Sequence, residues 1–210
     1  MIFKLINFDW DGTLADTRHT AYLAMETVFY HFNLEPPSKD EFLKHITSQG
    51  MLAFYHERGV PKNITRADLA IMFQKYFNDP ENHKNLILRP GAIETLTACR
   101  SKGIKISIVS GSAHNVISIG VDKFKMSNLI DHIQADAGDK IDELRLVGSR
   151  FSAEPNEAIY VDDTYEGLSA AKKVGMTAVG ITGGFSEERR LLEAGPDFLI
   201  PNLQELLPLL

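Results

Sequence analysis

Short apolar runs alternate with amphipathic segments along most of this chain. Runs typical of β-strands lie at residues 2–8, 104–109, 158–161, 177–181 and 198–200, with a weaker one at 132–134. Helical periodicity between them predicts helices over residues 91–102, 113–124, 141–150, 166–174 and 187–193. Strands that alternate with helices indicate a mostly parallel sheet, and nearly continuous apolar strands are expected where both sheet faces are covered. The pattern therefore predicts a doubly wound α/β fold.

Residues 17–88 break this alternation. They contain no convincing strand, and their periodicity predicts helices over residues 20–32, 38–46, 51–58 and 65–77. Two segments, Ser38-x-x-Glu41 and Thr65-x-x-Asp68, resemble capping boxes. Because βα connections usually have 2–6 residues, we expect residues 17–88 to form a separate helical domain. Residues 1–16 and 89–210 would then form the α/β core. An insertion directly after the first strand favours a lid over a merely decorative insertion.

Polar residues follow three of the predicted strands. The candidates are Asp9, Asp11, Gly12 and Thr13 after the first strand, Ser110, Gly111 and Ser112 after the second, Asp162 and Asp163 after the strand at 158–161, and Lys140 before the helix that leads into that strand. Ligands of open α/β sheets bind outside the carboxyl ends of the strands. Each residue alone has an ordinary explanation as a helix cap, a turn or a solvated side chain. Together, in this order, they indicate one site.

Phosphoryl transfer is the chemistry that fits this set of side chains. A carboxylate can attack phosphorus and form an aspartyl-phosphate. Mg²⁺ bound by oxygen ligands would screen the anionic phosphate from the anionic nucleophile. A second carboxylate can protonate the leaving oxygen and then activate water. Hydroxyls, backbone N–H groups and a lysine can hold the phosphate oxygens.

Residues 9–14, Asp-Trp-Asp-Gly-Thr-Leu, resemble the first motif of the haloacid dehalogenase superfamily, in the branch with a helical cap of the C1 type. Residues 106–110 resemble its second motif, Lys140 its third, and residues 160–163 its acidic fourth. The flanking segments 89–91, 170–176 and 180–185 also fit, and phosphoglycolate phosphatase-like members are the most similar. The resemblance implies a Rossmann-like core with an inserted α-helical cap. It also implies a Mg²⁺-dependent phosphatase, a phosphoric monoester hydrolase, that acts on a small phosphorylated metabolite.

The resemblance also implies a role for each motif residue. Asp9 would be the nucleophile and a metal ligand, and Asp11 the general acid/base with its backbone carbonyl on the metal. Lys140 would pair with both the phosphate and the nucleophile, and Asp163 would complete the metal site. The phosphate-binding residues would be Thr13, Ser110, Gly111 and Ser112.

The fourth motif departs from the usual family pattern. Asp162 stands where glycine is common, and Gly167 stands where a further Asp is common. We therefore take Asp162 and Asp163 as the acidic pair, and the sequence leaves open which of them binds the metal directly. Trp10 replaces the more usual Leu or Met, and we expect it to pack locally.

Three other functions stay open at this point: a haloacid dehalogenase, a phosphomutase of the β-phosphoglucomutase type, and a catalytically inactive binding module. Asp11 argues against the dehalogenase, because displacing a halide needs no acid on the leaving group. The mutase needs cap groups that shield a phosphoenzyme from water. Occupation of all four motif positions argues against an inactive module. Candidates for substrate specificity are the turn Thr47-Ser48-Gln49-Gly50 and the nearby Lys44, His45, His56 and Arg58.

Composition and charge limit the kinds of molecule that this protein is expected to bind. The 210 residues carry a formal net charge of −6 without a basic stripe, which argues against nucleic-acid binding. The single cysteine, Cys99, fits a reducing cytoplasm, and we expect no signal peptide and no membrane span. Seven scattered histidines make a zinc site an unfavourable hypothesis. The sequence leaves open whether the protein is a monomer or a homodimer.

Overall fold

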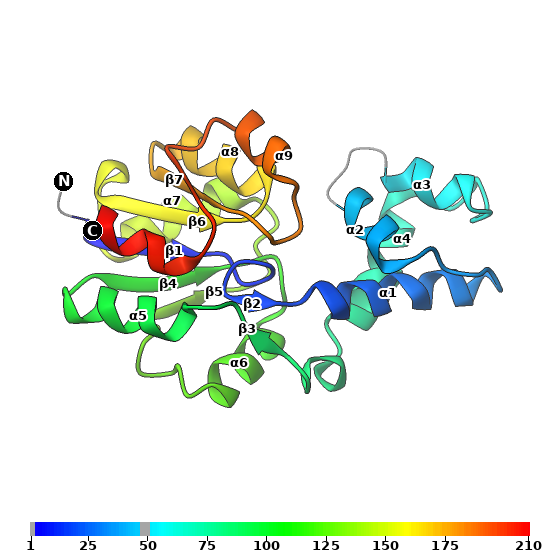
Figure 1. Ribbon diagram of the computed structural model, residues 1–210, viewed down its shortest axis with the longest axis horizontal. Coiled ribbons are helices and arrows are strands. Elements are labelled where there is room, and N and C mark those ends of the chain that lie inside the picture. The colour runs from blue at the N-terminus through cyan, green and yellow to red at the C-terminus, as the bar shows by residue number, and fades with distance from the viewer. Residues whose placement is uncertain (1–2, 47–50) are drawn as a thin grey trace.

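A parallel β-sheet forms the centre of the protein. The structure, a computed structural model, describes residues 3–46 and 51–210, and within these residues the sheet has six strands in the order β5-β4-β1-β6-β7-β8 (Figure 1). The strands are β1 (Leu5–Phe8), β4 (Lys105–Val109), β5 (His132–Gln134), β6 (Ala158–Asp162), β7 (Thr177–Ile181) and β8 (Phe198–Ile200). Every neighbouring pair in this sheet is parallel.

Helices cover both faces of the sheet. Helices α5 (Ala92–Ser101) and α6 (His114–Lys123), with the C-terminal 3₁₀ segment η3 (Leu203–Leu209), share one apolar cluster with the sheet. Helices α7 (Lys140–Arg150), α8 (Tyr165–Val174) and α9 (Glu188–Glu193) share the cluster on the other face. The doubly wound α/β fold is therefore confirmed. In the part of the chain that the structure describes, no helix has the length and apolar character needed to cross a bilayer.

Strand β1 lies at the point where the direction of winding changes. All four of its residues are buried, as expected for a parallel strand covered on both faces. Phe8 is in register with Ile108 of β4 on one side and with Val161 of β6 on the other. The carboxyl ends of β4, β1 and β6 therefore lie side by side, at the position where open α/β sheets bind their ligands.

Within residues 17–88, the described helices pack around an apolar cluster of their own. These cap helices are α1 (Arg18–His31), α2 (Lys39–His45), α3 (Met51–Glu57) and α4 (Arg66–Phe77), and they lie to one side of the sheet (Figure 1). Their cluster includes Met25, Val28, Phe29, Phe42, Phe54, Tyr55, Leu69 and Phe77. The capping box at Thr65 is formed. At Ser38 only the serine half is formed, because the Glu41 carboxylate pairs with Arg58 instead.

The chain passes from the core to the cap helices and back again through two connecting segments, here called the crossings. A short antiparallel ribbon joins them. Strand β2 (Ala15–Asp16) pairs with β3 (Ile87–Leu88), which follows the 3₁₀ turn η1 (Pro80–His83). The prediction that residues 17–88 contain no strand was therefore wrong at β3. Two paired residues are too few to give a periodic signal. Because the ribbon closes both crossings, we propose residues 17 and 88 as the limits of the cap domain. A further 3₁₀ turn, η2 (Pro155–Glu157), leads into β6.

Candidate active site

The structure brings the predicted site residues together at three strand ends. Asp9 and Asp11 follow β1, Ser110 and Ser112 follow β4, and Asp162 and Asp163 end and follow β6. Lys140 is the first residue of α7. Three groups of hydrogen bonds join these side chains: one around Lys140, one around Asp11 and one around Asp163.

Lys140 links two carboxylates. Its Nζ lies 2.9 Å from Asp9 Oδ1 and 2.7 Å from Asp162 Oδ2. Burial alone would lower the pKa of this ammonium, but the charges of Asp162 and Asp9 outweigh it and raise the pKa well above its ordinary value. Lys140 therefore remains a cation that faces Asp9.

The Asp9 carboxyl is buried and has a raised pKa. Burial is the main cause, and repulsion from Asp162, Asp163 and Asp11 adds to it, while Lys140 opposes it. Four carboxyl groups thus meet one ammonium group in a poorly solvated place. Such an excess of negative charge favours a bound cation or an anionic substrate accompanied by one.

Asp11 is held by two serine hydroxyls. Ser112 Oγ donates to Asp11 Oδ2 over 2.5 Å, and Ser110 Oγ lies 3.3 Å from the same oxygen. Burial raises the pKa of Asp11 above its ordinary value, although the serine hydrogen bonds oppose this. A carboxyl group with a raised pKa is suited to donating a proton near neutral pH.

The two neighbouring acids after β6 have different partners. Asp162 Oδ1 accepts hydrogen bonds from the N–H and hydroxyl of Thr164, over 2.7 and 2.6 Å, and its Oδ2 accepts from Lys140. Asp163 Oδ1 accepts from Thr13 Oγ1 over 3.1 Å, and its Oδ2 accepts from the Phe185 N–H over 2.6 Å. Burial and the charge of Asp162 raise the pKa of Asp163 to about 7.

Glycines make room for both of these acids. A Cβ on Gly12, where φ is +79°, would lie 2.2 Å from Asp163 Oδ2, and one on Gly184 would lie 2.1 Å from it. A Cβ on Gly167 would lie 1.9 Å from Asp162 Oδ2. An aspartate at 167 is therefore incompatible with Asp162 in its present position, which explains both departures from the fourth motif at once.

Comparison with known proteins agrees with this geometry. Residues 6–181 match the family described as "Haloacid dehalogenase-like hydrolase". This chain belongs to that family. The resemblance inferred from residues 9–14 and the later motifs is therefore confirmed.

Relatives of the family cover almost the whole chain. Phosphoglycolate phosphatase 1 of Pseudomonas aeruginosa is 24% identical over 220 residues, with 98% of this chain and 79% of the relative aligned. Pyrophosphatase PpaX of Bacillus pumilus is 24% identical, with 95% and 93% aligned. A solved haloacid dehalogenase-like family protein from Streptococcus pneumoniae has a TM-score of 0.84 at 20% identity, with 99% and 98% covered. CbbY of Rhodobacter sphaeroides, solved in complex with phosphate, has a TM-score of 0.75 at 22% identity, with 98% and 96% covered.

The predicted phosphate-binding residues occupy two sides of the site. Ser110 and Ser112 face Asp11, and Thr13 faces Asp163. A Cβ on Gly111 would meet only the Ala137 carbonyl oxygen, at 3.8 Å, so this position does not need a glycine for space.

Two of the predicted specificity residues, His56 and Arg58, make contacts with other residues of the cap. His56 Nε2 lies 2.9 Å from the Ile64 carbonyl oxygen. The Arg58 guanidinium pairs with Glu41 and lies 3.8 Å from the Phe54 ring centroid. The predicted substrate loop, residues 47–50, lies outside the described residues. Trp10 is buried and packs against Gly120, as expected for a packing residue.

Three residues of the site were not assigned a role from the sequence. Thr164 holds Asp162, and its position as the N-cap of α8 was a usable local signal. Arg89 donates to the carbonyl oxygens of Thr182, over 2.6 Å, and Gly183. Phe185 holds Asp163 through its N–H. Arg89 and Phe185 lie in segments that resemble the family, but contacts between residues so far apart leave no local pattern.

The negative charge of this site favours a divalent cation, but the described side chains do not form a complete set of metal ligands. Four carboxyl groups meet one ammonium, and repulsion among these carboxyl groups adds to burial in raising the pKa values of Asp9 and Asp163. Among the described residues, however, no three His, Cys, Asp or Glu side chains are arranged to hold one metal ion. Mg²⁺ is compatible with this, because it commonly binds through one or two carboxylates and keeps several waters.

Proposed function

We propose that this protein is a Mg²⁺-dependent phosphoric monoester hydrolase that acts on a small phosphorylated metabolite, in the manner of phosphoglycolate phosphatase, through an aspartyl-phosphate. The arrangement around Asp9 carries the proposal: a buried carboxylate held by Lys140, with Asp11 two residues away. Family membership and the names of the relatives support it.

The proposed reaction has two steps. In the first, Asp9 attacks phosphorus, the bond from phosphorus to the ester oxygen breaks, and Asp11 gives its proton to the departing oxygen. In the second, Asp11 takes a proton from water, the water oxygen attacks phosphorus, and the Asp9 carboxylate leaves. The Ser112 hydroxyl, which donates to Asp11 Oδ2 over 2.5 Å, would keep Asp11 oriented in both steps.

Lys140 and the neighbouring hydroxyls would bind the phosphate. The Lys140 ammonium neutralises charge on the phosphate and on Asp9, and it is itself oriented by Asp162. Thr13, Ser110, Gly111 and Ser112 supply hydroxyl and backbone donors at the surrounding strand ends.

The metal would be held by the carboxylates of Asp9 and Asp163 and by the main-chain carbonyl of Asp11. We favour Asp163 over Asp162 because Asp162 already pairs with the Lys140 ammonium, whereas the hydrogen-bond donors to Asp163 are neutral groups, the Thr13 hydroxyl and the Phe185 N–H. When bound, Mg²⁺ would screen the charge of the phosphate from that of the nucleophile.

Asp163 gives a prediction about stability without the metal. Its pKa is about 7 in the folded protein, against about 3.9 in an unfolded chain. The folded state therefore binds the proton more tightly between these values, so this carboxyl makes the free energy of unfolding fall as pH rises from about 4 to about 7. We expect Asp163→Asn to have a higher Tm than the wild type in EDTA at pH 8, and the difference to vanish near pH 4.

Magnesium should reverse this order. Mg²⁺ stabilises the ionised carboxyl, so it should raise the Tm of the wild type and raise that of Asp163→Asn much less. Scanning fluorimetry with EDTA or Mg²⁺ measures both effects, with the exposed Asp142→Asn on α7 as the matched control. An equal Mg²⁺ response in wild type and Asp163→Asn would remove Asp163 from the metal site.

A substrate panel tests the function itself. The purified protein is given phosphoglycolate, sugar phosphates, nucleotides and pyrophosphate with Mg²⁺, and released phosphate is measured. We expect hydrolysis of at least one monoester and none in EDTA. Turnover of chloroacids in place of phosphates would establish a dehalogenase. An isomerised sugar phosphate without free phosphate would establish a mutase.

A further inference from the structure

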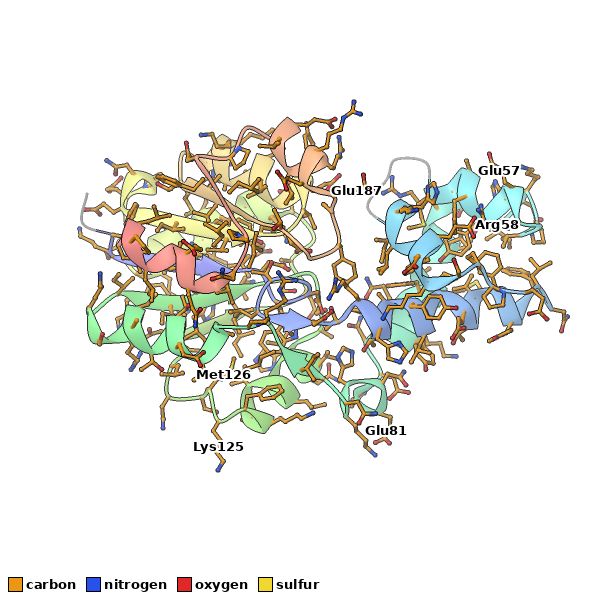
Figure 2. All side chains as sticks on the ribbon, in the orientation of Figure 1. Glu57, Arg58, Glu81, Lys125, Met126 and Glu187 are labelled. Carbon is orange, nitrogen blue, oxygen red and sulfur yellow. The ribbon has the colours of Figure 1, made fainter. Side chains whose placement is uncertain are left out.

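The segment of residues 182–187, here called the bridging loop, runs from β7 to α9 and reaches toward the cap helices (Figure 1). Figure 2 shows Glu187 at the end of this loop, on the side that faces the cap. The Phe185 side chain packs against the apolar cluster of the cap helices, although the rest of its loop belongs to the core.

Phe185 also contacts the active site. Its N–H donates to Asp163 Oδ2 over 2.6 Å, and the next N–H, of Ser186, donates to the Asp163 carbonyl oxygen over 3.3 Å. Its ring lies over the turn that carries the nucleophile, because a Cβ on Gly12 would be 2.9 Å from the ring atom Cδ2. One residue thus contacts the cap, the nucleophile turn and an acid of the site.

Arg89 fixes the other end of the bridging loop. Its guanidinium donates to the carbonyl oxygens of Thr182 and Gly183. Arg89 directly follows β3, on which the chain returns from the cap, and its N–H donates to the Leu14 carbonyl oxygen over 2.8 Å. The loop is therefore anchored to the crossing about which the cap would move.

We propose that Phe185 is a positioning residue that couples the cap to the catalytic site, its ring forming the core-side contact for the closed cap and its N–H holding Asp163. This inference rests on the proposed function, because it concerns substrate enclosure in the phosphatase site. Loss of the ring contact makes the closed state less populated, and the apparent substrate affinity falls in proportion to that population.

Variants of Phe185 test the ring contact. We expect Phe185→Ala to raise KM about tenfold with a smaller change in kcat, the size expected for losing an aromatic contact, and Phe185→Leu to recover most of the loss. Phe198→Ala is the matched control, because Phe198 is a phenylalanine of the α/β core domain whose side chain is exposed on β8. A Phe185→Ala protein with the KM of Phe198→Ala would overturn the inference.

Hydrogen exchange provides a readout that does not depend on turnover. We expect faster exchange in Phe185→Ala than in the wild type at residues 14–18 and 86–89, the two crossings, and no change in Phe198→Ala. Unchanged exchange at the crossings would also overturn the cap contact. If the wild type hydrolyses no phosphate ester, the proposed function fails, whereas this comparison still decides whether Phe185 restrains the cap.

A proline variant isolates the N–H of Phe185. Phe185→Pro lacks both the ring and the donor to Asp163, whereas Phe185→Ala lacks only the ring. We expect Mg²⁺, titrated by calorimetry without substrate, to bind Phe185→Pro at least about tenfold more weakly than Phe185→Ala, as when a partner of a metal ligand is lost. Equal Mg²⁺ affinities would show that the N–H does not position Asp163.

Discussion

We expect the replacement of Asp9 by Asn to lower kcat for phosphate-ester hydrolysis by roughly 10⁴-fold or more, the loss that follows when an attacking group is removed. The amide has the shape of the carboxylate but cannot attack phosphorus or accept the phosphoryl group. It also lacks the charge that Lys140 now faces over 2.9 Å. Steady-state release of phosphate from the best substrate of the panel measures the effect.

The fold should survive this change. Asp162 remains as a partner for Lys140, and the pKa of Asp9 is raised by burial and by its acidic neighbours, so loss of its charge relieves repulsion. We therefore expect an unchanged circular dichroism spectrum and an unchanged or raised Tm. Asp142→Asn, an exposed change on α7, should keep wild-type turnover. Wild-type turnover in Asp9→Asn would rule out the covalent mechanism.

Rapid quenching tests the intermediate directly. Wild-type protein mixed with substrate and quenched in acid should carry phosphate on the peptide that contains Asp9, and Asp9→Asn should carry none there. Mass spectrometry of the digest locates the group. Phosphate on another residue would show that this other residue is the nucleophile, and the proposed hydrolase function would still hold.

The core could be predicted from sequence because its signals are local. Strand β1 is buried on both faces, so its residues form a continuous apolar run, and the acids of the first motif follow it directly. The cap helices likewise have periodic apolar positions that form their shared cluster. The family resemblance then assigned roles that the pattern alone could not.

The ribbon and the separate roles of Asp162 and Asp163 could not be predicted, for different reasons. The pairing of β2 with β3 involves two residues on each side and depends on chain segments about 70 residues apart. Asp162 and Asp163 are adjacent, and successive side chains of an extended chain point in opposite directions. Their partners, Lys140 for one and Phe185 for the other, therefore decide their roles, and these partners become visible only in three dimensions.

Asp11→Asn should separate the two proposed steps. An aryl phosphate has a leaving group that needs no proton, so Asp9 should still be phosphorylated, and a burst of aryl alcohol should precede slow turnover. An alkyl phosphate such as phosphoglycolate needs the acid in the first step as well. We expect steady-state turnover to fall by roughly 10²- to 10⁴-fold, the usual contribution of general acid/base catalysis, with a burst for the aryl ester only.

The comparison of the two esters is decisive because replacing Asp11 and replacing Asp9 should affect the burst differently. Loss of the nucleophile removes the burst for every ester, whereas loss of the acid leaves it wherever departure is easy. The amide oxygen of the Asp11→Asn variant can still accept from Ser112, whose hydroxyl now lies 2.5 Å from Asp11 Oδ2, so the local geometry should persist. Equal losses for both esters without a burst would show that Asp11 acts by holding the site together. In that case the raised pKa of Asp11 would reflect its burial alone and not a role in proton transfer.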